Sequence, residues 1–176
     1  MSHITEEFFR NNPVAIPDLE QSNGIGGIVN NSSLDRVKRC IAINEPKYLR
    51  ALMGLDMFSE YISDVNAAKW VPLFDKLVDV DNSVSPIANW VYIQYVTDNY
   101  SKLTGIGTIK NKSDNSQSAQ PFMNQILAWN DMVFQHETIL PWLYENRADF
   151  EQLNSFDTCN WDAFCTPKAM AEGYFL

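Results

Sequence analysis

The sequence is poor in cysteine and histidine, the residues that most often mark a redox, metal or nucleophilic site. Its three cysteines, Cys40, Cys159 and Cys165, are an odd number with no CxxC pair, so neither a disulfide framework nor a zinc knuckle is indicated. A reducing, intracellular setting is expected. Of the two histidines, His136 lies in an apolar helical pattern and His3 near the start, and no ligand cluster surrounds either. We therefore expect no catalytic residue, cofactor or metal.

Long hydrophobic runs are also missing. No apolar stretch approaches the roughly 20 residues that a membrane span requires, and the opening MSHITEEFF lacks the basic and apolar order of a secretory signal. A soluble protein is expected. With 176 residues, 45% of them hydrophobic, the chain can form one domain with a genuine core and is short for two.

Positive charge is scarce, since the formal net charge is -9. This argues against a protein that grips phosphates over a broad basic surface. Five of the 13 basic residues nevertheless fall within fifteen positions: Arg36, Lys38, Arg39, Lys47 and Arg50. They alternate with apolar residues, as on the solvated side of an amphipathic helix. The alternative is docking onto an acidic protein neighbour or a nearby phosphate backbone, which makes Arg36 and Arg39 interface candidates.

What the chain does contain is a series of helical patterns. Apolar residues recur at steps of three and four and predict helices over 33 to 45, 46 to 53, 55 to 62, 67 to 77, 85 to 100 and 116 to 150. Pro46 is expected to break the first pattern, Gly54 to end a helix, Ser85 to cap one and Pro141 to bend the last. The strongly apolar 85 to 100 segment is expected to be central. His136, on the seam of the last helix, is expected to be a hydrogen-bonded core or interface residue.

Two segments outside these helices are predicted to be arms. Residues 1 to 31 carry Pro13, Pro17 and the glycines at 24 to 27, which suit a linker, because no strand precedes them and no Lys-Ser/Thr pair follows. One helical turn capped by Thr5 is expected there. Residues 153 to 176 are aromatic but aperiodic, so Trp161 and Phe164 either fold back on the body or anchor another subunit.

A third arm is predicted between the last two helices. Residues 103 to 120 read LTGIGTIKNKSDNSQSAQ, and alternating residues around two glycines indicate an extended loop or short β-hairpin. Its few residues could not bury it, so it needs a partner. The interface candidates here are Thr104, Ile106, Thr108, Ile109, Lys110 and Lys112; the lysines also serve to discourage edge-to-edge aggregation. The whole is predicted to be a mainly α-helical bundle over 32 to 152 with arms at 1 to 31 and 153 to 176.

Five runs of sequence carry a resemblance to a known family: Glu45-Pro46-Lys47-Tyr48-Leu49-Arg50-Ala51-Leu52-Met53-Gly54, residues 58 to 61, residues 90 to 100, Thr104-Gly105-Ile106-Gly107 and Asn115-Ser116-Gln117-Ser118-Ala119. In this order they resemble the head-to-tail connector (neck) proteins of tailed bacteriophages, in particular those of Bacteroidetes hosts, including crAss-like phages. The likeness covers about residues 33 to 150. The aromatic tail after Leu153 departs from a simple adaptor.

The resemblance implies a structural virion protein, assembled in the host cytoplasm and placed in the neck. It implies a homo-oligomeric ring of about a dozen copies, a dodecamer, beneath the portal protein. The ring would contact other neck or tail proteins, join head to tail, and let DNA pass without specific binding. The acidic balance suits such a wall, because it does not hold phosphates tightly.

Two functions from other classes stay open on the sequence alone. One is a helical protein-binding module with a regulatory role, which would use the basic residues 36 to 50 against an acidic partner. The other is a small hydrolase or lyase built around His136 and a spatially close cysteine or carboxylate.

Overall fold

The chain is mainly helical, as the periodicity of the sequence predicted. The computed structural model describes residues 2–10, 14–16, 19, 32–104, 107–110 and 121–150. Its elements in order are the 3-10 helix η1 (Glu6–Phe9), α1 (Ser32–Ser63), η2 (Ala68–Trp70), α2 (Val71–Leu77), α3 (Pro86–Tyr100), β1 (Ser101–Thr104), β2 (Gly107–Lys110), α4 (Pro121–Glu145) and η3 (Arg147–Asp149).

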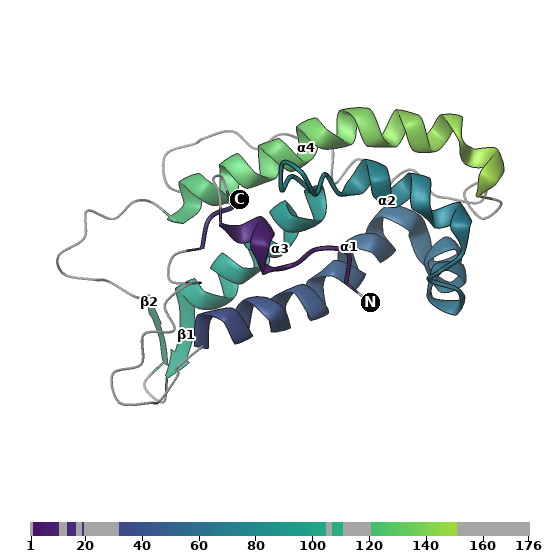
Figure 1. Ribbon diagram of the computed structural model, residues 1–176. Helices are drawn as coiled ribbons and strands as arrows, with labels where there is room; N and C mark the ends of the chain where they lie inside the picture. The colour runs from purple at the N-terminus through teal and green to yellow at the C-terminus, as the bar shows by residue number, and fades with distance from the viewer. Residues whose placement is uncertain are drawn as a thin grey trace.

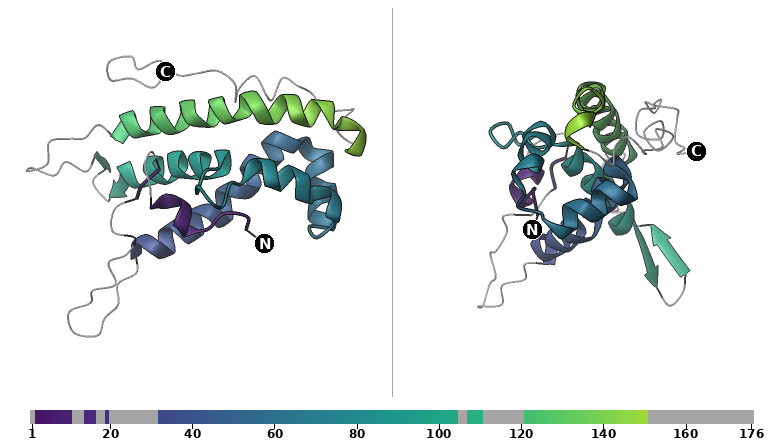
Figure 2. Two further views of the ribbon diagram at one scale, coloured as in Figure 1. Left: turned by 45° about the horizontal axis from the view of Figure 1, so that its top comes forward. Right: turned by 90° about the vertical axis from the view of Figure 1, so that its right-hand side faces the viewer.

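Helix α3 is the centre of the body, as its apolar sequence predicted. It packs along α1 on one side and along α4 on the other (Figure 1). The turned views show the same three-layer arrangement (Figure 2). Trp90 joins the layers, because its ring lies 6.4 Å from Tyr48 of α1 and 6.5 Å from Trp129 of α4, centroid to centroid. Ser85 caps α3 as predicted, since the backbone N–H of Ile87 donates to its Oγ at 3.2 Å.

Helix α1 corrects one prediction and confirms another. Pro46 does not break the helix but lies inside it. Pro46 and Ala42, the residue whose carbonyl loses its usual N–H donor, are both exposed, so water can take that hydrogen bond. The interruption comes at Gly54, where φ is 76° and ψ is 176°. A residue with a Cβ does not readily adopt this conformation, so the predicted end at Gly54 is confirmed.

Helix α4 is shorter than the pattern predicted. It was expected to reach residue 150 but ends at Glu145, and Pro141 lies inside it. Asn146 leaves the helical conformation, with φ -95° and ψ 16°. Both its backbone N–H, at 3.0 Å, and its side-chain amide, at 2.8 Å, donate to the carbonyl of Trp142, so Asn146 closes the last turn. The predicted start near residue 116 lies outside the described residues.

The N-terminal residues pack onto the body. The predicted turn forms as η1, although the Thr5 side chain makes no capping hydrogen bond. Residues 2–10 and 14–16 contribute five buried apolar side chains to the core: Ile4, Phe8, Phe9, Val14 and Ile16. The sequence predicts an arm here because these residues lack a period, yet a short segment with one 3-10 turn buries its large side chains against the helical body. Residues 20 to 31 of the predicted arm lie outside the described residues.

Strands β1 and β2 follow directly on α3. They pair antiparallel, with Ser101 opposite Lys110, Lys102 opposite Ile109, Leu103 opposite Thr108 and Thr104 opposite Gly107. Both lie beyond the C-terminal end of α3, away from the three helical layers (Figures 1 and 2). Across the described ranges, the search for a helix long and apolar enough to cross a bilayer finds none.

Candidate functional site

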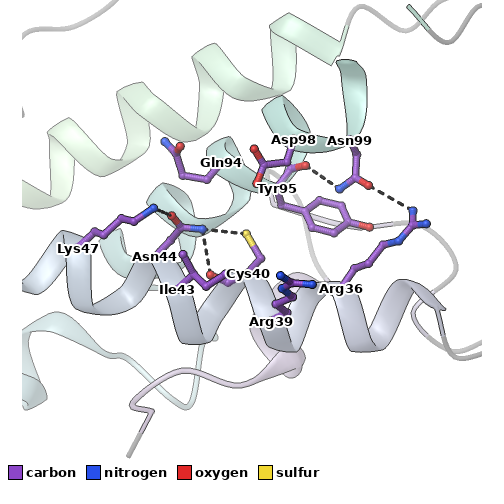
Figure 3. A pocket seen from close by; sticks show the side chains of 10 residues that line it. All are labelled: Arg36, Arg39, Cys40, Ile43, Asn44, Lys47, Gln94, Tyr95, Asp98 and Asn99. Carbon is purple, nitrogen blue, oxygen red and sulfur yellow. Dashed lines mark hydrogen bonds between the residues drawn. The ribbon is translucent and has the colours of Figure 1, made fainter. Parts of the chain in front are cut away.

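A groove of about 220 Å³ lies between the first half of α1 and the last turns of α3 (Figure 3). Helix α1 contributes Arg36, Arg39 and Lys47, and α3 contributes Gln94, Asp98 and Asn99. The α1 residues meet there because positions 36, 39, 43 and 47 are three or four residues apart and therefore share one helical face. The sequence predicted Arg36 and Arg39 as interface candidates, and the structure brings both to this groove.

Side-chain amides hold two of the basic groups in place. The Arg36 guanidinium donates to Asn99 Oδ1 at 3.4 Å, and the Lys47 ammonium donates to Asn44 Oδ1 at 3.1 Å. Asn44 is itself fixed, because its Nδ2 donates to the Cys40 carbonyl at 3.0 Å. Arg39 is exposed and makes no hydrogen bond or ion pair with another residue of the described ranges. The groove therefore presents two cations, those of Arg36 and Lys47, that are held by amide side chains before any ligand arrives.

The groove is positively charged, and its cysteine is unreactive. Three cations line it against one carboxylate, Asp98, so anionic groups are favoured there. Cys40 forms part of the floor, where burial raises the pKa of its thiol. Its Sγ points toward the Val91 carbonyl at 3.6 Å. A thiol held in the protonated form is a poor nucleophile, so the groove suits binding and not covalent catalysis.

The other predicted interface residues divide between the strands and undescribed segments. Thr104 lies on β1, and Thr108, Ile109 and Lys110 lie on β2, within one short antiparallel pair. Ile106, Lys112, Trp161 and Phe164 lie outside the described residues.

His136 lies in the core at the junction of α1 and α4. Its ring is fully buried, and a 2.6 Å hydrogen bond joins its Nε2 to the Tyr48 hydroxyl. The two rings are stacked, with centroids 5.8 Å apart. The predicted role as a hydrogen-bonded core residue is therefore confirmed. Within the described ranges, no group of three or more His, Cys, Asp or Glu side chains is placed to hold a metal ion.

A second buried polar cluster fixes the N-terminal residues to α1. Glu45 is 3% exposed, and its carboxylate accepts hydrogen bonds from the Ser2 hydroxyl and, at 2.7 Å, from the backbone N–H of His3. The His3 ring stacks on Phe74, with centroids 3.4 Å apart, and its Nε2 lies 2.6 Å from the Tyr61 hydroxyl. This cluster explains how a segment without periodicity is held in one place.

The Glu45 cluster predicts a pH dependence. Burial raises the pKa of Glu45 above its ordinary value near 4.5, so between these two pKa values the folded chain binds more protons than the unfolded chain. Its contribution to stability therefore falls as pH rises through that window. Glu45→Gln, which is neutral at every pH and keeps an acceptor for His3, is expected to remove the fall. Urea unfolding of the parent and of Glu45→Gln from about pH 4.5 to pH 8 checks this. The difference between their free energies of unfolding should change in favour of Glu45→Gln as pH rises.

The control for this measurement is Glu137→Gln. Glu137 is an exposed glutamate on α4, so its substitution should leave the pH profile parallel to that of the parent chain. A parallel profile for Glu45→Gln as well would mean that Glu45 does not carry the effect.

The outer face of α4 carries exposed apolar side chains among polar ones, such as Asn130 and Glu137. Met123 is 36%, Leu127 40% and Phe134 69% exposed, and with Pro141 they follow one another at steps of four, seven and seven. Such steps place them on one line along the helix. This line, here called the α4 outer stripe, lies opposite the face that α4 buries through Ala128, Met132 and Leu143. The stripe was not predicted from the sequence, although its spacing is visible there, because the inner apolar seam was sufficient to predict the helix.

In comparison with known proteins, no family model, no curated protein and no solved structure matches this chain.

Proposed function

We propose that the chain is a structural subunit that forms an oligomeric ring between the portal and the tail of a tailed bacteriophage. In this role it joins head to tail and lines the passage for DNA. The proposal rests on the resemblance of residues 33 to 150 to phage neck proteins, and the α4 outer stripe is the structural observation that supports it most.

Helix α4 exposes three large apolar side chains, those of Met123, Leu127 and Phe134, on the side opposite its buried face. The inner face of α4 is covered by α3. A monomer that stays alone has no use for a second line of large apolar side chains, whereas helices packed side by side around a ring would bury it. Burial of one such side chain contributes about 1.5–3 kcal/mol, so a few suffice to favour contact.

The predicted arms fit the same role. In a cyclic assembly one surface of each copy contacts a different surface of the next. Strands that lie beyond the helical layers, such as β1 and β2, would reach a neighbour without disturbing the core. In the proposed ring, Thr104, Thr108 and Lys110 contact the adjoining subunit, and Trp161 and Phe164 anchor the tail on another copy or layer.

Substitution of the α4 outer stripe tests the proposal. Leu127→Asp and Phe134→Asp are each expected to raise the concentration at which half of the chain is assembled by at least about tenfold, because each would place a charge in an apolar contact. Light scattering coupled to size exclusion, with electron microscopy of the particles, measures the assembly. The measurement is made with the chain alone and with the portal protein of the same phage.

The matched control is Leu55→Asp. Leu55 is 60% exposed but lies on α1, outside the stripe, so this substitution should leave assembly unchanged. Deleting residues 105 to 115 tests the arm in whole phage, where heads are expected to accumulate without tails. Two results together contradict the proposal. The purified chain stays monomeric when the portal protein is present, and phage that lack the chain still join heads to tails.

The alternative function is a helical protein-binding module. The basic groove between α1 and α3 favours it, because oriented cations in a groove can bind an acidic segment of another protein. In that case the parent chain and the α4 outer stripe variants would all be monomeric. Binding of the acidic partner would be lost only when groove residues are changed.

A further inference from the structure

The loop between α2 and α3 has an unusually fixed shape. Backbone hydrogen bonds close it in both directions, from Asp79 N to Val84 O at 2.9 Å and from Val84 N to Asp79 O at 3.0 Å. The Asp79 carboxylate also accepts from the backbone and the side-chain amide of Asn82, at 3.0 and 2.8 Å. Ser83, at φ 54°, completes the turn. Residues 79 to 84, here called the acidic knob, therefore hold one conformation.

The knob presents an apolar tip between two carboxylates. Val80 is 70% exposed, and Asp79 and Asp81 on either side of it are exposed as well. Hydrogen bonds from Asn82 lower the pKa of Asp79, so this carboxylate stays ionised at neutral pH. The surface is therefore a small hydrophobic contact carrying two negative charges.

The basic groove has the opposite pattern. Ile43, on its α1 wall, is 45% exposed. Arg39 lies one helical turn before Ile43 and Lys47 one turn after it. Arg36 lies one turn before Arg39. With Asp98 counted, the groove carries an excess of two positive charges, which equals the negative charge of the knob. An apolar centre flanked by charge on both surfaces, with opposite signs, makes the knob and the groove complementary in charge.

The two surfaces lie at opposite ends of α3. The knob comes directly before Pro86, and the groove is formed by residues 94 to 99. About 10 residues of α-helix separate them, which is about 15 Å at 1.5 Å per residue. A rigid loop cannot cross this distance, so the knob does not reach the groove of its own chain.

We propose that the acidic knob of one copy inserts into the basic groove of the next copy. The inference rests on the proposed ring and identifies one of its contacts. Because knob and groove are different surfaces, the contact is heterologous. An open row of copies then has one free groove at one end and one free knob at the other, so the assembly grows until these two meet and the ring closes. A single contact of this size is weak, and closure of the ring supplies the remaining affinity through effective concentration.

Charge reversal tests the contact. Arg39→Glu and Asp81→Lys are each expected to raise the half-assembly concentration by at least about tenfold at low salt, since each replaces attraction by repulsion. The chain that carries both substitutions is expected to recover most of the assembly, because the altered knob then meets an altered groove of opposite charge. The parent should also assemble less as salt rises from about 0.05 M to 0.5 M.

The controls are Arg50→Glu and Asp75→Lys, which make the same charge changes at exposed positions outside groove and knob. They should assemble as the parent does. Thermal unfolding of every variant checks that the fold is intact, which is expected because Arg39 and Asp81 are exposed.

The inference is overturned by a parent chain that is monomeric at low salt up to about 1 mM, and equally by single variants that assemble as the parent does. The second result leaves the ring proposal standing on the α4 outer stripe. Loss of assembly in both single variants without recovery in the double variant also overturns it, because a specific pair must be restored by exchanging its charges. If the ring proposal itself is wrong, the parent chain will not associate with the portal protein.

Discussion

Phe9→Ala is expected to lower the free energy of unfolding by about 3–5 kcal/mol. Phe9 is fully buried although it lies in the first ten residues of the chain. Removing its ring leaves a cavity and loses the transfer free energy of the aromatic group. A loss of this size is a large part of the 5–15 kcal/mol that usually holds a domain of this size together.

The structure offers a control with the same chemical change. Phe134 is 69% exposed on α4, and Phe134→Ala should change the free energy of unfolding by no more than about 0.5 kcal/mol. Both variants are compared with the parent by urea unfolding, at concentrations below assembly. Equal and small effects would mean that residues 2–10 do not belong to the cooperative core.

The burial of Phe9 also marks a limit of reasoning from sequence. Ile4, Phe8 and Phe9 have no helical period that extends beyond one turn, and Pro13 and Pro17 follow closely. Their place is set by a polar anchor on a distant part of the chain, since Glu45 accepts hydrogen bonds from Ser2 and His3 across more than forty residues. A local pattern contains no information about such a partner.

Local signals predicted those features that local chemistry decides. The apolar run over 87 to 96 predicted a central helix, because a helix without a polar side must be covered on all sides. Gly54 predicted an interruption through its access to positive φ, and Ser85 followed by Pro86 predicted a helix start. The predicted break at Pro46 was wrong, because the cost of a proline inside a helix depends on whether water reaches the carbonyl that loses its N–H donor.

The candidate groove was predictable only in part. The cluster from Arg36 to Arg50 indicated a basic surface, and two of its residues were named as interface candidates. The opposite wall was missed, because Asn99 lies 63 residues from Arg36 and meets it only through the packing of α3 on α1. A single sequence shows which face of a helix is charged, whereas the pairing of two helices follows from the whole core.

The second large effect concerns the buried pair of Tyr48 and His136. Tyr48→Phe and His136→Leu are each expected to lower the free energy of unfolding by about 1–3 kcal/mol. Each removes one side of the 2.6 Å hydrogen bond while the other polar group stays in a site that is 0% exposed. The low polarity of the surroundings makes that loss larger than it would be at the surface.

The double variant separates the hydrogen bond from packing. The double variant removes both sides of this hydrogen bond at once, so it should be less destabilised than the sum of the single variants by at least about 1 kcal/mol. The comparison is Tyr144→Phe, at a tyrosine that is 55% exposed on α4. It should add to His136→Leu without coupling.

The outcome bears on the role of His136. Strong coupling to Tyr48 means that the imidazole serves the packing of α1 against α4, the arrangement that keeps the basic groove and the α4 outer stripe on opposite helices of one rigid body. Additive effects would mean that the hydrogen bond contributes little to folding.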